Sequence, residues 1–384
     1  MPTIEELLDR DQLRVGYIQR KASAGRKDAV GTQKEAATFP TTLGSSLDSL
    51  HYVITISIGT PPVTQTVLID TGSDVSWVQC APCLQCHPQA DPLFDPSSSS
   101  TYSPFSCSSV ECLLLDDTAC TSSSQCQYVV KYGGGSNTTG TYSSDTLELG
   151  GPNVVVQEFQ FGCSHVESGF VSPIDGLMGL GGGPQSLVSQ TAGRFGSALS
   201  YCLPPTAATS GFLTLGAANS GLGFVTTPLL SSQQIPTYYF VVLEGITLNG
   251  QLLDVPPSVF SAGGTILDSG TIITRLPPTA YAALSSTFKA AMQQYPAAPP
   301  KSLFDTCFDF TGLTSVTVPP VSLVFSGGAV VDLDPSGIIF NGCLTFAANR
   351  DDRSLGIIGN VQQRTFEVLY DVGQGVVGFR AGAC

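Results

Sequence analysis

Apolar and polar residues alternate over much of the chain, which predicts a protein built mainly of β-strands. The clearest case is the segment from Tyr52 to Ile58, where apolar residues fall at every second position. Further apolar runs of strand length occur at residues 128–130, 239–243 and 365–370, and 41 glycines provide turns. We therefore expect an all-β fold with a few short helices.

Three segments have helical patterns instead. Ser186 to Gln190 and Thr279 to Gln293 are the two helices expected in the body of the chain, and the second follows a proline pair that suits a first helical turn. A third helix is expected near the start, because a set of apolar residues falls close to one helical face there: Ile4, Leu7, Leu8, Val15 and Ile18.

One short phrase occurs twice, at residues 67–73 and 265–271. In each copy an apolar run ends in an aspartate, and Asp70 and Asp268 lie 198 residues apart in a chain of 384. Gene duplication followed by two-fold pairing of the halves would leave this spacing. A second pair of related phrases, residues 176–179 and 356–359, places two apolar residues between glycines in each half. We expect these segments to pass beneath the two aspartates.

Two facing carboxyls form a catalytic pair. Their mutual repulsion separates their pKa values, so that the pair holds one proton over the acidic range. One carboxyl then activates a water as a base while the other polarises a carbonyl as an acid, without a metal or cofactor. The sequence thus predicts Asp70 and Asp268 as catalytic residues.

The residues that follow each aspartate suit this role. A glycine allows a sharp turn, a hydroxyl can donate to the carboxylate, and another hydroxyl can bond to the opposite loop. The expected supporting residues are Thr71, Gly72, Ser73, Ser269, Gly270 and Thr271.

From about His51 to Cys384 the chain resembles the pepsin-like aspartic proteases, and within them the plant nepenthesin-type branch. The motifs that carry this resemblance lie at residues 70–80, 132–136, 175–180, 268–271 and 356–363. The resemblance implies a bilobal fold of two β lobes related by a pseudo-two-fold axis, with a cleft between them. It divides the chain into a helical propeptide remnant (1–45), an N-terminal lobe (46–230) and a C-terminal lobe (231–384).

The function implied is that of an acid endopeptidase that acts on protein or peptide substrates and prefers hydrophobic residues at the cut. We expect a monomer. The alternative is an inhibitor-like binding protein of the same fold, because plant relatives include inhibitors of cell-wall glycosidases.

Tyr132 and Gly133 begin a glycine-rich segment that should form a hairpin flap over the substrate. The tyrosine can bond to an indole, and Trp77 is the only tryptophan. Relatives often carry an acidic residue where Gly134 stands, so this flap should be looser. Asn137 begins an N-glycosylation sequon.

Twelve cysteines, none in the first 45 residues, indicate a disulfide framework in an oxidising compartment. The resemblance implies the pairs Cys80–Cys83, Cys86–Cys163, Cys107–Cys126, Cys112–Cys120, Cys202–Cys384 and Cys307–Cys343. A zinc site at Cys80, Cys83 and Cys86 is the rival interpretation. We expect extracellular or vacuolar localisation through the secretory pathway, although the first residues form no signal peptide.

The net charge of −14 disfavours nucleic acid and anionic membranes as partners, and no apolar run is long enough to span a membrane. Charge is uneven, because seven basic and five acidic residues before residue 35 give +2 and the other 350 residues give −16. We expect this basic segment to dock on an acidic cleft and to leave on acidification, after a cut between Thr38 and Leu50. The three histidines, His51, His87 and His165, are expected to be surface or structural residues.

Overall fold

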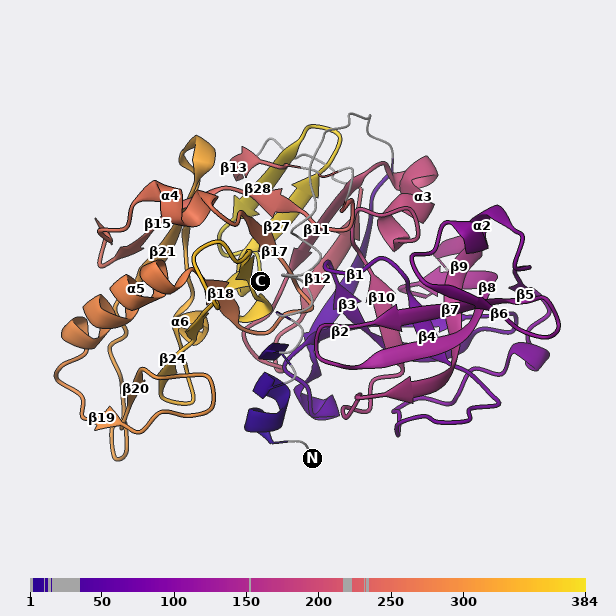
Figure 1. Ribbon diagram of the computed structural model, residues 1–384, viewed down its shortest axis with the longest axis horizontal. Helices are drawn as coiled ribbons and strands as arrows, with labels where there is room; N and C mark the ends of the chain where they lie inside the picture. Colours follow the sequence, from indigo (N-terminus) through magenta and orange to yellow (C-terminus); the bar gives the residue numbers. More distant parts are fainter. Residues whose placement is uncertain are drawn as a thin grey trace.

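A computed structural model describes residues 3–9, 11–12, 15, 35–151, 153–216, 223–230, 232 and 235–384. It confirms the mostly β fold, with two lobes that lie side by side in Figure 1 and a small number of short helices. The predictions for Ile18 and for all seven basic residues before residue 35 lie outside the described part of the chain.

The strands of the N-terminal lobe and the last two strands of the chain share one 15-stranded sheet. From one edge it runs in the order β13-β28-β27-β11-β12-β1-β2-β3-β10-β4-β9-β8-β7-β6, and β5 pairs with β8. Because β27 and β28 come from the end of the chain, this sheet also joins the two lobes. The strands are β1 (Ala37–Leu43), β2 (Tyr52–Ile58), β3 (Val63–Asp70), β4 (Trp77–Gln79), β5 (Ser103–Pro104), β6 (Thr118–Cys120), β7 (Cys126–Lys131), β8 (Asn137–Leu149), β9 (Val154–Ser168), β10 (Gly176–Gly179), β11 (Ala198–Cys202), β12 (Gly211–Leu215), β13 (Val225–Pro228), β27 (Glu367–Asp371) and β28 (Val376–Arg380).

The C-terminal lobe contains three smaller sheets, ordered β14-β17-β26-β18-β25, β16-β15-β21-β22 and β19-β20-β24-β23. Their strands are β14 (Phe240–Val241), β15 (Leu243–Leu248), β16 (Gln251–Leu252), β17 (Thr265–Leu267), β18 (Thr274–Leu276), β19 (Ala297–Ala298), β20 (Cys307–Phe308), β21 (Val321–Phe325), β22 (Val330–Asp332), β23 (Ile339–Phe340), β24 (Cys343–Leu344), β25 (Phe346–Ala348) and β26 (Gly356–Ile358).

Both helices expected in the body are present. The α-helices are α2 (Val110–Leu113), α3 (Leu187–Phe195), α4 (Pro257–Ser261), α5 (Pro278–Ala291) and α6 (Pro335–Ile338), and the 3₁₀ turns are η1 (Gly44–Leu47), η2 (Pro96–Ser98), η3 (Ser326–Gly328) and η4 (Asn360–Gln363). Ser186 caps α3 by accepting from the Ser189 amide at 3.2 Å. A proline begins α5, as its missing N–H permits.

The same strand motif occurs in each lobe. In the N-terminal lobe β3, which ends at Asp70, runs parallel to β10 and pairs Asp70 with Gly179. In the C-terminal lobe β17, which ends just before Asp268, runs parallel to β26. The partner strands also pair antiparallel with the strand that follows each aspartate loop, β10 with β4 and β26 with β18. The two repeated phrases are thus parts of one repeated structure, as duplication of a lobe would produce.

The start of the body differs from our prediction. The stretch from Thr38 to Leu50 was expected to hold a cleavage site, but β1 occupies much of it and pairs with both β12 and β2. Phe39 on this strand is buried in the main core. A cut within β1 would remove a strand from the interior of the sheet, so a propeptide junction fits better before Ala37.

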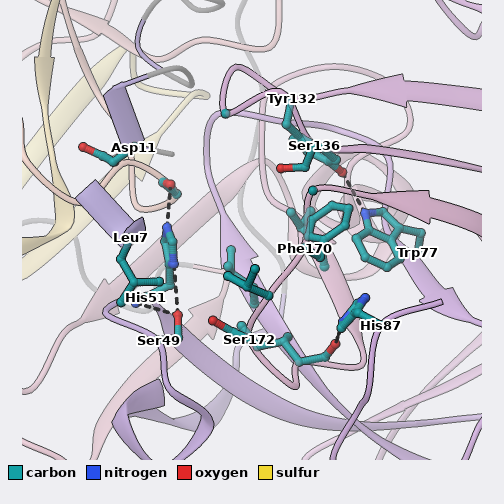
Figure 2. Close-up of a pocket in the computed structure, with 18 residues that line it drawn as sticks. Leu7, Asp11, Ser49, His51, Trp77, His87, Tyr132, Ser136, Phe170 and Ser172 are labelled. Atoms are coloured by element: carbon teal, nitrogen blue, oxygen red, sulfur yellow. Dashed lines mark hydrogen bonds between the residues drawn. The ribbon is translucent and has the colours of Figure 1, made fainter. Parts of the chain in front are cut away.

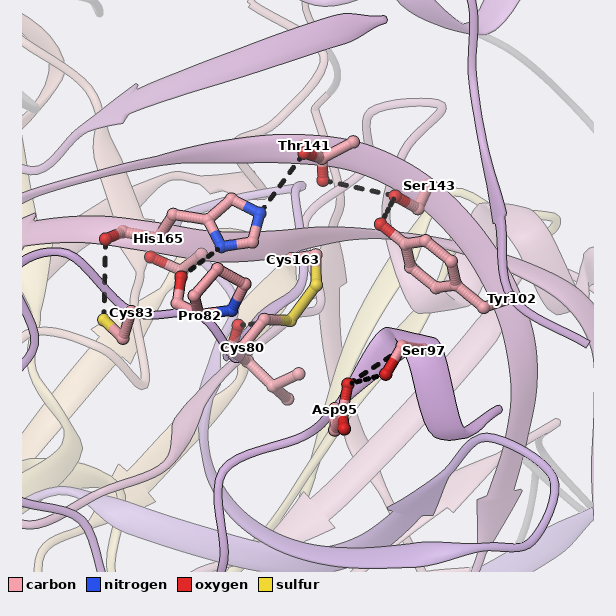
Figure 3. Close-up of a disulfide and its surroundings, with 12 residues drawn as sticks. Cys80, Pro82, Cys83, Asp95, Ser97, Tyr102, Thr141, Ser143, Cys163 and His165 are labelled. Atoms are coloured by element: carbon pink, nitrogen blue, oxygen red, sulfur yellow. Dashed lines mark hydrogen bonds between the residues drawn. A yellow bond between two sulfur atoms is a disulfide. The ribbon is translucent and has the colours of Figure 1, made fainter. Parts of the chain in front are cut away.

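Four of the six predicted disulfides are wrong. Cys202–Cys384 and Cys307–Cys343 are confirmed, whereas the other pairs are Cys80–Cys163, Cys83–Cys86, Cys107–Cys120 and Cys112–Cys126. The strand register explains the first exchange, because β4 runs parallel to β9 and pairs Val78 with Cys163. Cys80 follows directly, with its Cα 5.4 Å from that of Cys163 (Figure 3). Since each of these thiols is in a disulfide, the zinc interpretation is also wrong.

The first residues form the expected helix, which the structure describes at residues 4–9, 11–12 and 15. Thr3 and Glu6 cap it reciprocally, each side chain accepting from the other residue's backbone N–H. Its apolar face is buried against the body, since Leu7, Leu8 and Val15 are 8%, 1% and 3% exposed.

Candidate active site

The two aspartate loops have matching hydrogen bonds. Gly72 N donates to Asp70 Oδ1 at 2.9 Å, and Gly270 N donates to Asp268 Oδ1 at 2.9 Å. The Ser73 hydroxyl donates to Asp70 Oδ2 and the Thr271 hydroxyl to Asp268 Oδ2, each at 2.5 Å. Each carboxylate is therefore oriented by one amide and one hydroxyl, and the hydroxyl is the one that the short motif predicts.

Reciprocal bonds hold the two loops against each other. The Thr71 amide donates to Ser269 Oγ at 3.0 Å, and the Ser269 amide donates to Thr71 Oγ1 at 2.9 Å. Thr71 and Ser269 are buried, and so are the neighbouring Asp70 and Asp268. Because each bond spans the lobe interface, the aspartates keep a fixed relation to one another.

Glycines beneath the loops allow this close packing. A Cβ on Gly179 would lie 2.2 Å from the Asp74 carbonyl oxygen, and one on Gly359 would lie 2.6 Å from the Ile272 carbonyl oxygen. Any side chain there would push a loop outward. The segments 176–179 and 356–359 thus pack against the aspartate loops, as expected from the sequence.

Tyr132 lies at the start of the turn between β7 and β8, which its amide closes by donating to Ser136 O at 2.8 Å. Its hydroxyl accepts a hydrogen bond from Trp77 Nε1 at 2.7 Å, which is the contact expected from sequence. Phe170 packs against both rings (Figure 2). Asn137, the sequon residue, begins β8 and donates to Ser168 Oγ at 2.7 Å.

A small pocket of about 110 Å³ lies on one side of Tyr132. Its walls are largely apolar, and Figure 2 shows Leu7 and Asp11 of the first helix beside it. A larger cavity of about 690 Å³ is also lined by Tyr132 and includes Gly72, Ser73 and Asp74. Leu114 to Asp117 of the cysteine-rich insert also line this second cavity. Both cavities adjoin an aspartate loop, and the flap borders both.

Asp11 attaches the first helix to the C-terminal lobe. Its carboxylate accepts from the amides of Ile272 and Ile273, just after the Asp268 loop, and from Arg275 Nη2 at 3.0 Å. Both side chains of the Asp11–Arg275 ion pair are fully buried. Burial lowers the pKa of Arg275, and the charge of Asp11 opposes that effect. Sequence reasoning expected basic residues of this segment on an acidic cleft, whereas this ion pair has the opposite polarity.

The three histidines were expected to be surface or structural residues, and the structure gives His51 and His87 structural partners that the sequence did not identify. His51 Nε2 lies 3.1 Å from the Gly270 carbonyl oxygen in the Asp268 loop. His87 Nδ1 pairs with the buried Glu167 at 2.6 Å. His165 lies between Pro82 O and the Thr141 hydroxyl (Figure 3). No sequence signal could have identified His51, because its partner is 219 residues away.

Within the described ranges, no three histidine, cysteine or acidic side chains gather as metal ligands would. No helix in that part of the chain has the length and apolar character needed to cross a membrane.

Comparisons with known proteins show the family to which this chain is similar. Residues 52–217 match the family model described as xylanase inhibitor N-terminal, and residues 238–381 match xylanase inhibitor C-terminal. An Arabidopsis thaliana protein named as an aspartyl protease family protein is 40% identical over 100% of this chain and 83% of its own length. Aspartic proteinase nepenthesin-1 of Nepenthes gracilis is 36% identical over 87% of this chain and 78% of its own.

The fold is also that of a solved seed protein. The crystal structure of conglutin gamma, a basic 7S globulin from lupine seeds, superimposes with a TM-score of 0.73 at 22% identity. The match covers 91% of this chain and 95% of that one.

Proposed function

Because this chain belongs to the pepsin-like aspartic protease family, we propose that it is an acid endopeptidase with Asp70 and Asp268 as its catalytic pair. The single observation that carries the proposal is the pair of matching, cross-bonded aspartate loops. A binding protein has no need to keep an amide and a hydroxyl on each of two buried carboxylates.

The proposed mechanism uses a water held between the carboxyls. The ionised aspartate removes a proton from this water, which attacks the scissile carbonyl, while the protonated aspartate donates to the carbonyl oxygen. Thr71 and Ser269 keep the loops in register, and Ser73 and Thr271 orient the carboxylates. Preorganised donors of this kind lower the cost of rearrangement in the transition state.

An extended peptide would pass under Tyr132 and enter the cavities on either side of it. The small pocket is lined by Leu68, Phe170 and Leu177, which favours an apolar substrate side chain there. The tyrosine, held by Trp77, would close over the peptide and exclude water. Hydrophobic residues at the cut are therefore the proposed preference.

The residues before Ala37 would act as a propeptide, which leaves β1 in the sheet. Leu7 and Asp11 line the small pocket that the substrate would enter, and both aspartates are 0% exposed in this state. The helix would therefore have to leave before a protein substrate could bind. Six disulfides are consistent with folding in the secretory pathway, and glycosylation at Asn137 stays a prediction.

The second candidate is an inhibitor-like binding protein, which the description of the two matching family models favours. In that case the surface around the cleft would bind a cell-wall glycosidase, and the buried aspartates would be remnants.

One assay separates the two functions. The full chain, incubated at pH 3 to 6 to allow removal of its first residues, is given a denatured protein substrate with and without pepstatin. Acid cleavage that pepstatin abolishes is the expected result. Absence of cleavage by folded protein, together with inhibition of a xylanase by the same preparation, would favour the binding protein.

A further inference from the structure

We propose that His87 is a positioning residue that holds Phe170 in the wall of the small pocket, and that it thereby decides how strongly this pocket prefers a large apolar substrate side chain over a small one. The inference rests on the proposed function, which gives the pocket an apolar preference but assigns its selectivity to no single residue.

The imidazole of His87 bridges the two ends of one loop. Nδ1 lies 2.6 Å from Glu167 Oε2, and Nε2 lies 2.7 Å from the Ile174 carbonyl oxygen. Glu167 is on β9 and Ile174 lies just before β10, so the ring closes the connection between these strands, the wall loop (residues 169–175). The side chains of His87 and Glu167 are 8% and 1% exposed. Because little water reaches these bonds, breaking them would leave buried polar groups unpaired.

Both bonds of the bridge depend on the imidazole. A carbonyl oxygen only accepts, so Nε2 donates to Ile174 O, and Nδ1 donates to Glu167 when that carboxyl is ionised. A leucine in place of His87 makes neither bond. An asparagine has both donors on one nitrogen, so it can keep the bond to Glu167 but cannot span the loop.

Phe170 lies within the wall loop and stacks on the imidazole. The two ring centroids are 5.6 Å apart, with an angle of 31° between the planes. The Phe170 ring also lies 5.1 Å from that of Trp77 and 6.0 Å from that of Tyr132 (Figure 2). Both His87 and Phe170 line the small pocket. A shift of Phe170 would therefore change the wall of the pocket and the contacts beneath the flap together.

The two halves of the wall loop are held differently. Gly169 packs against the flap turn, where a Cβ would lie 2.7 Å from Ser136 Cα. In the second half, the Ser172 hydroxyl donates to Asp48 O at 2.9 Å, a bond that does not involve His87. Loss of His87 should therefore loosen the half that carries Phe170 and leave the other half attached.

The first test needs no activity, because Trp77 is the only tryptophan of the chain and is 2% exposed. His87→Leu should shift the tryptophan emission to longer wavelength and increase its quenching by acrylamide, since Phe170 no longer covers the indole. Phe170→Ala should have the same effects, and His165→Gln, the matched control, should leave both readings at the wild-type values.

Folding of each variant is checked by circular dichroism. If His87→Leu does not fold, His87→Asn provides the same test and should give a smaller change in the same direction, because it keeps the Glu167 bond. Emission and quenching equal to wild type in the folded His87 variant would overturn the proposal, even if the protein proves to be no protease.

The second test measures selectivity with peptides of one sequence, in which either residue beside the cut is Phe or Ala. His87→Leu should lower the Phe-to-Ala ratio of kcat/KM about fivefold or more, chiefly by raising KM for the Phe peptide. The kcat for the Ala peptide should stay near that of wild type. Glu167→Gln can still bond to Nδ1 and should retain most of the ratio.

A double variant separates positioning from general support of the fold. Because His87 acts through Phe170, His87→Leu should change the Phe-to-Ala ratio little further in protein that already carries Phe170→Ala. If wild type cleaves both peptides and His87→Leu lowers kcat/KM equally for the two, the inference fails and the proposed protease function stands. If wild type cleaves neither peptide, the protease proposal fails, and the inference about selectivity fails with it, whatever the fluorescence of Trp77 shows.

Discussion

At the scale of single residues, Asp175 shows how a buried carboxyl supports the Asp70 strand. It accepts from the Thr66 amide on β3 at 2.5 Å and from the amides of Ala90 and Asp91 at 3.0 and 3.1 Å. Burial, and then the hydrogen bond with the Asp91 carboxyl, raise the pKa of Asp175 to about 6. The residue therefore holds a proton over the acidic range in which the enzyme is proposed to work.

This proton makes stability depend on pH. Since the folded pKa of Asp175 exceeds that of the unfolded chain, near 3.9, its contribution is complete below that pH and is lost as the pH rises through 6. The loss amounts to about 2–3 kcal/mol by pH 7. Asp175→Asn cannot titrate, so its free energy of unfolding should fall less between pH 4 and 7 than that of wild type. Denaturant unfolding at several pH values measures how the free energy of unfolding changes with pH. The control is Glu244→Gln, which changes an exposed carboxyl. Equal pH dependence in wild type and Asp175→Asn would contradict this explanation.

Sequence reasoning succeeded for the repeated motif, both for partners within three positions and for the Thr71–Ser269 bonds between its two copies. The amide and hydroxyl donors of each aspartate are two and three residues away, so the short motif contains the whole interaction. It identified no partner for His51 or Asp11, whose partners lie 219 and 264 residues distant and belong to no repeated motif. Such contacts depend on how the lobes pack, and no local pattern records that packing.

At the scale of elements, the flap and the cysteine-rich insert form one unit. The disulfide Cys112–Cys126 joins α2 to β7, the strand that leads to Tyr132. Gln185 donates to Leu114 O at 2.6 Å and ties the insert to the loop after β10. The insert thus supports the base of the flap and also forms a wall of the larger cavity.

Tyr132→Phe tests the flap directly. The change leaves the buried indole N–H of Trp77 without its partner, which costs about 1–3 kcal/mol. We expect kcat/KM to fall about tenfold, and Trp77→Phe combined with it to cost less than the sum of the two single changes. Activity assays on the four proteins of this cycle measure the coupling, with Tyr295→Phe as a control in the C-terminal lobe. Additive effects would mean that the hydrogen bond does not act in catalysis.

Element boundaries followed from the sequence better than their connections. Alternation placed β2, and the proline pair placed α5, to within a few residues. The disulfides of the insert were mispredicted because cysteine spacing does not show which thiols meet. Pairing of β6 with β7 sets Cys120 opposite Cys126, yet each of them bonds to another cysteine. Strand register and the position of α2 decide among these choices, and neither follows from cysteine spacing.

At the scale of the whole molecule, the first helix is attached to the C-terminal lobe near the Asp268 loop. Its attachment combines buried Leu7 and Leu8 with the Asp11–Arg275 ion pair. The boundaries at residues 45 and 230 stay predictions, although β1 favours a junction before Ala37.

Asp11→Asn should weaken this attachment, because it leaves the fully buried Arg275 without its counter-charge. Loss of one partner of a buried pair costs about 3–5 kcal/mol. Processing of the full chain should then begin at a higher pH, and its thermal unfolding temperature should fall. Gel analysis against pH and calorimetry check both effects, with Glu5→Gln, exposed on the same helix, as control. Unchanged processing and unfolding would show that the ion pair does not hold the helix in place.

The most direct test of the central claim is kcat/KM at acidic pH for wild type, Asp70→Asn, Asp268→Asn and the double variant on one denatured substrate. Residues that act as a unit are not additive. Each single change should therefore lower kcat/KM by about a thousandfold or more, and the double variant should be no worse than the singles. Glu244→Gln should retain wild-type activity. Pepstatin-sensitive cleavage that survives in either single variant would contradict the assignment of these two aspartates as the catalytic pair.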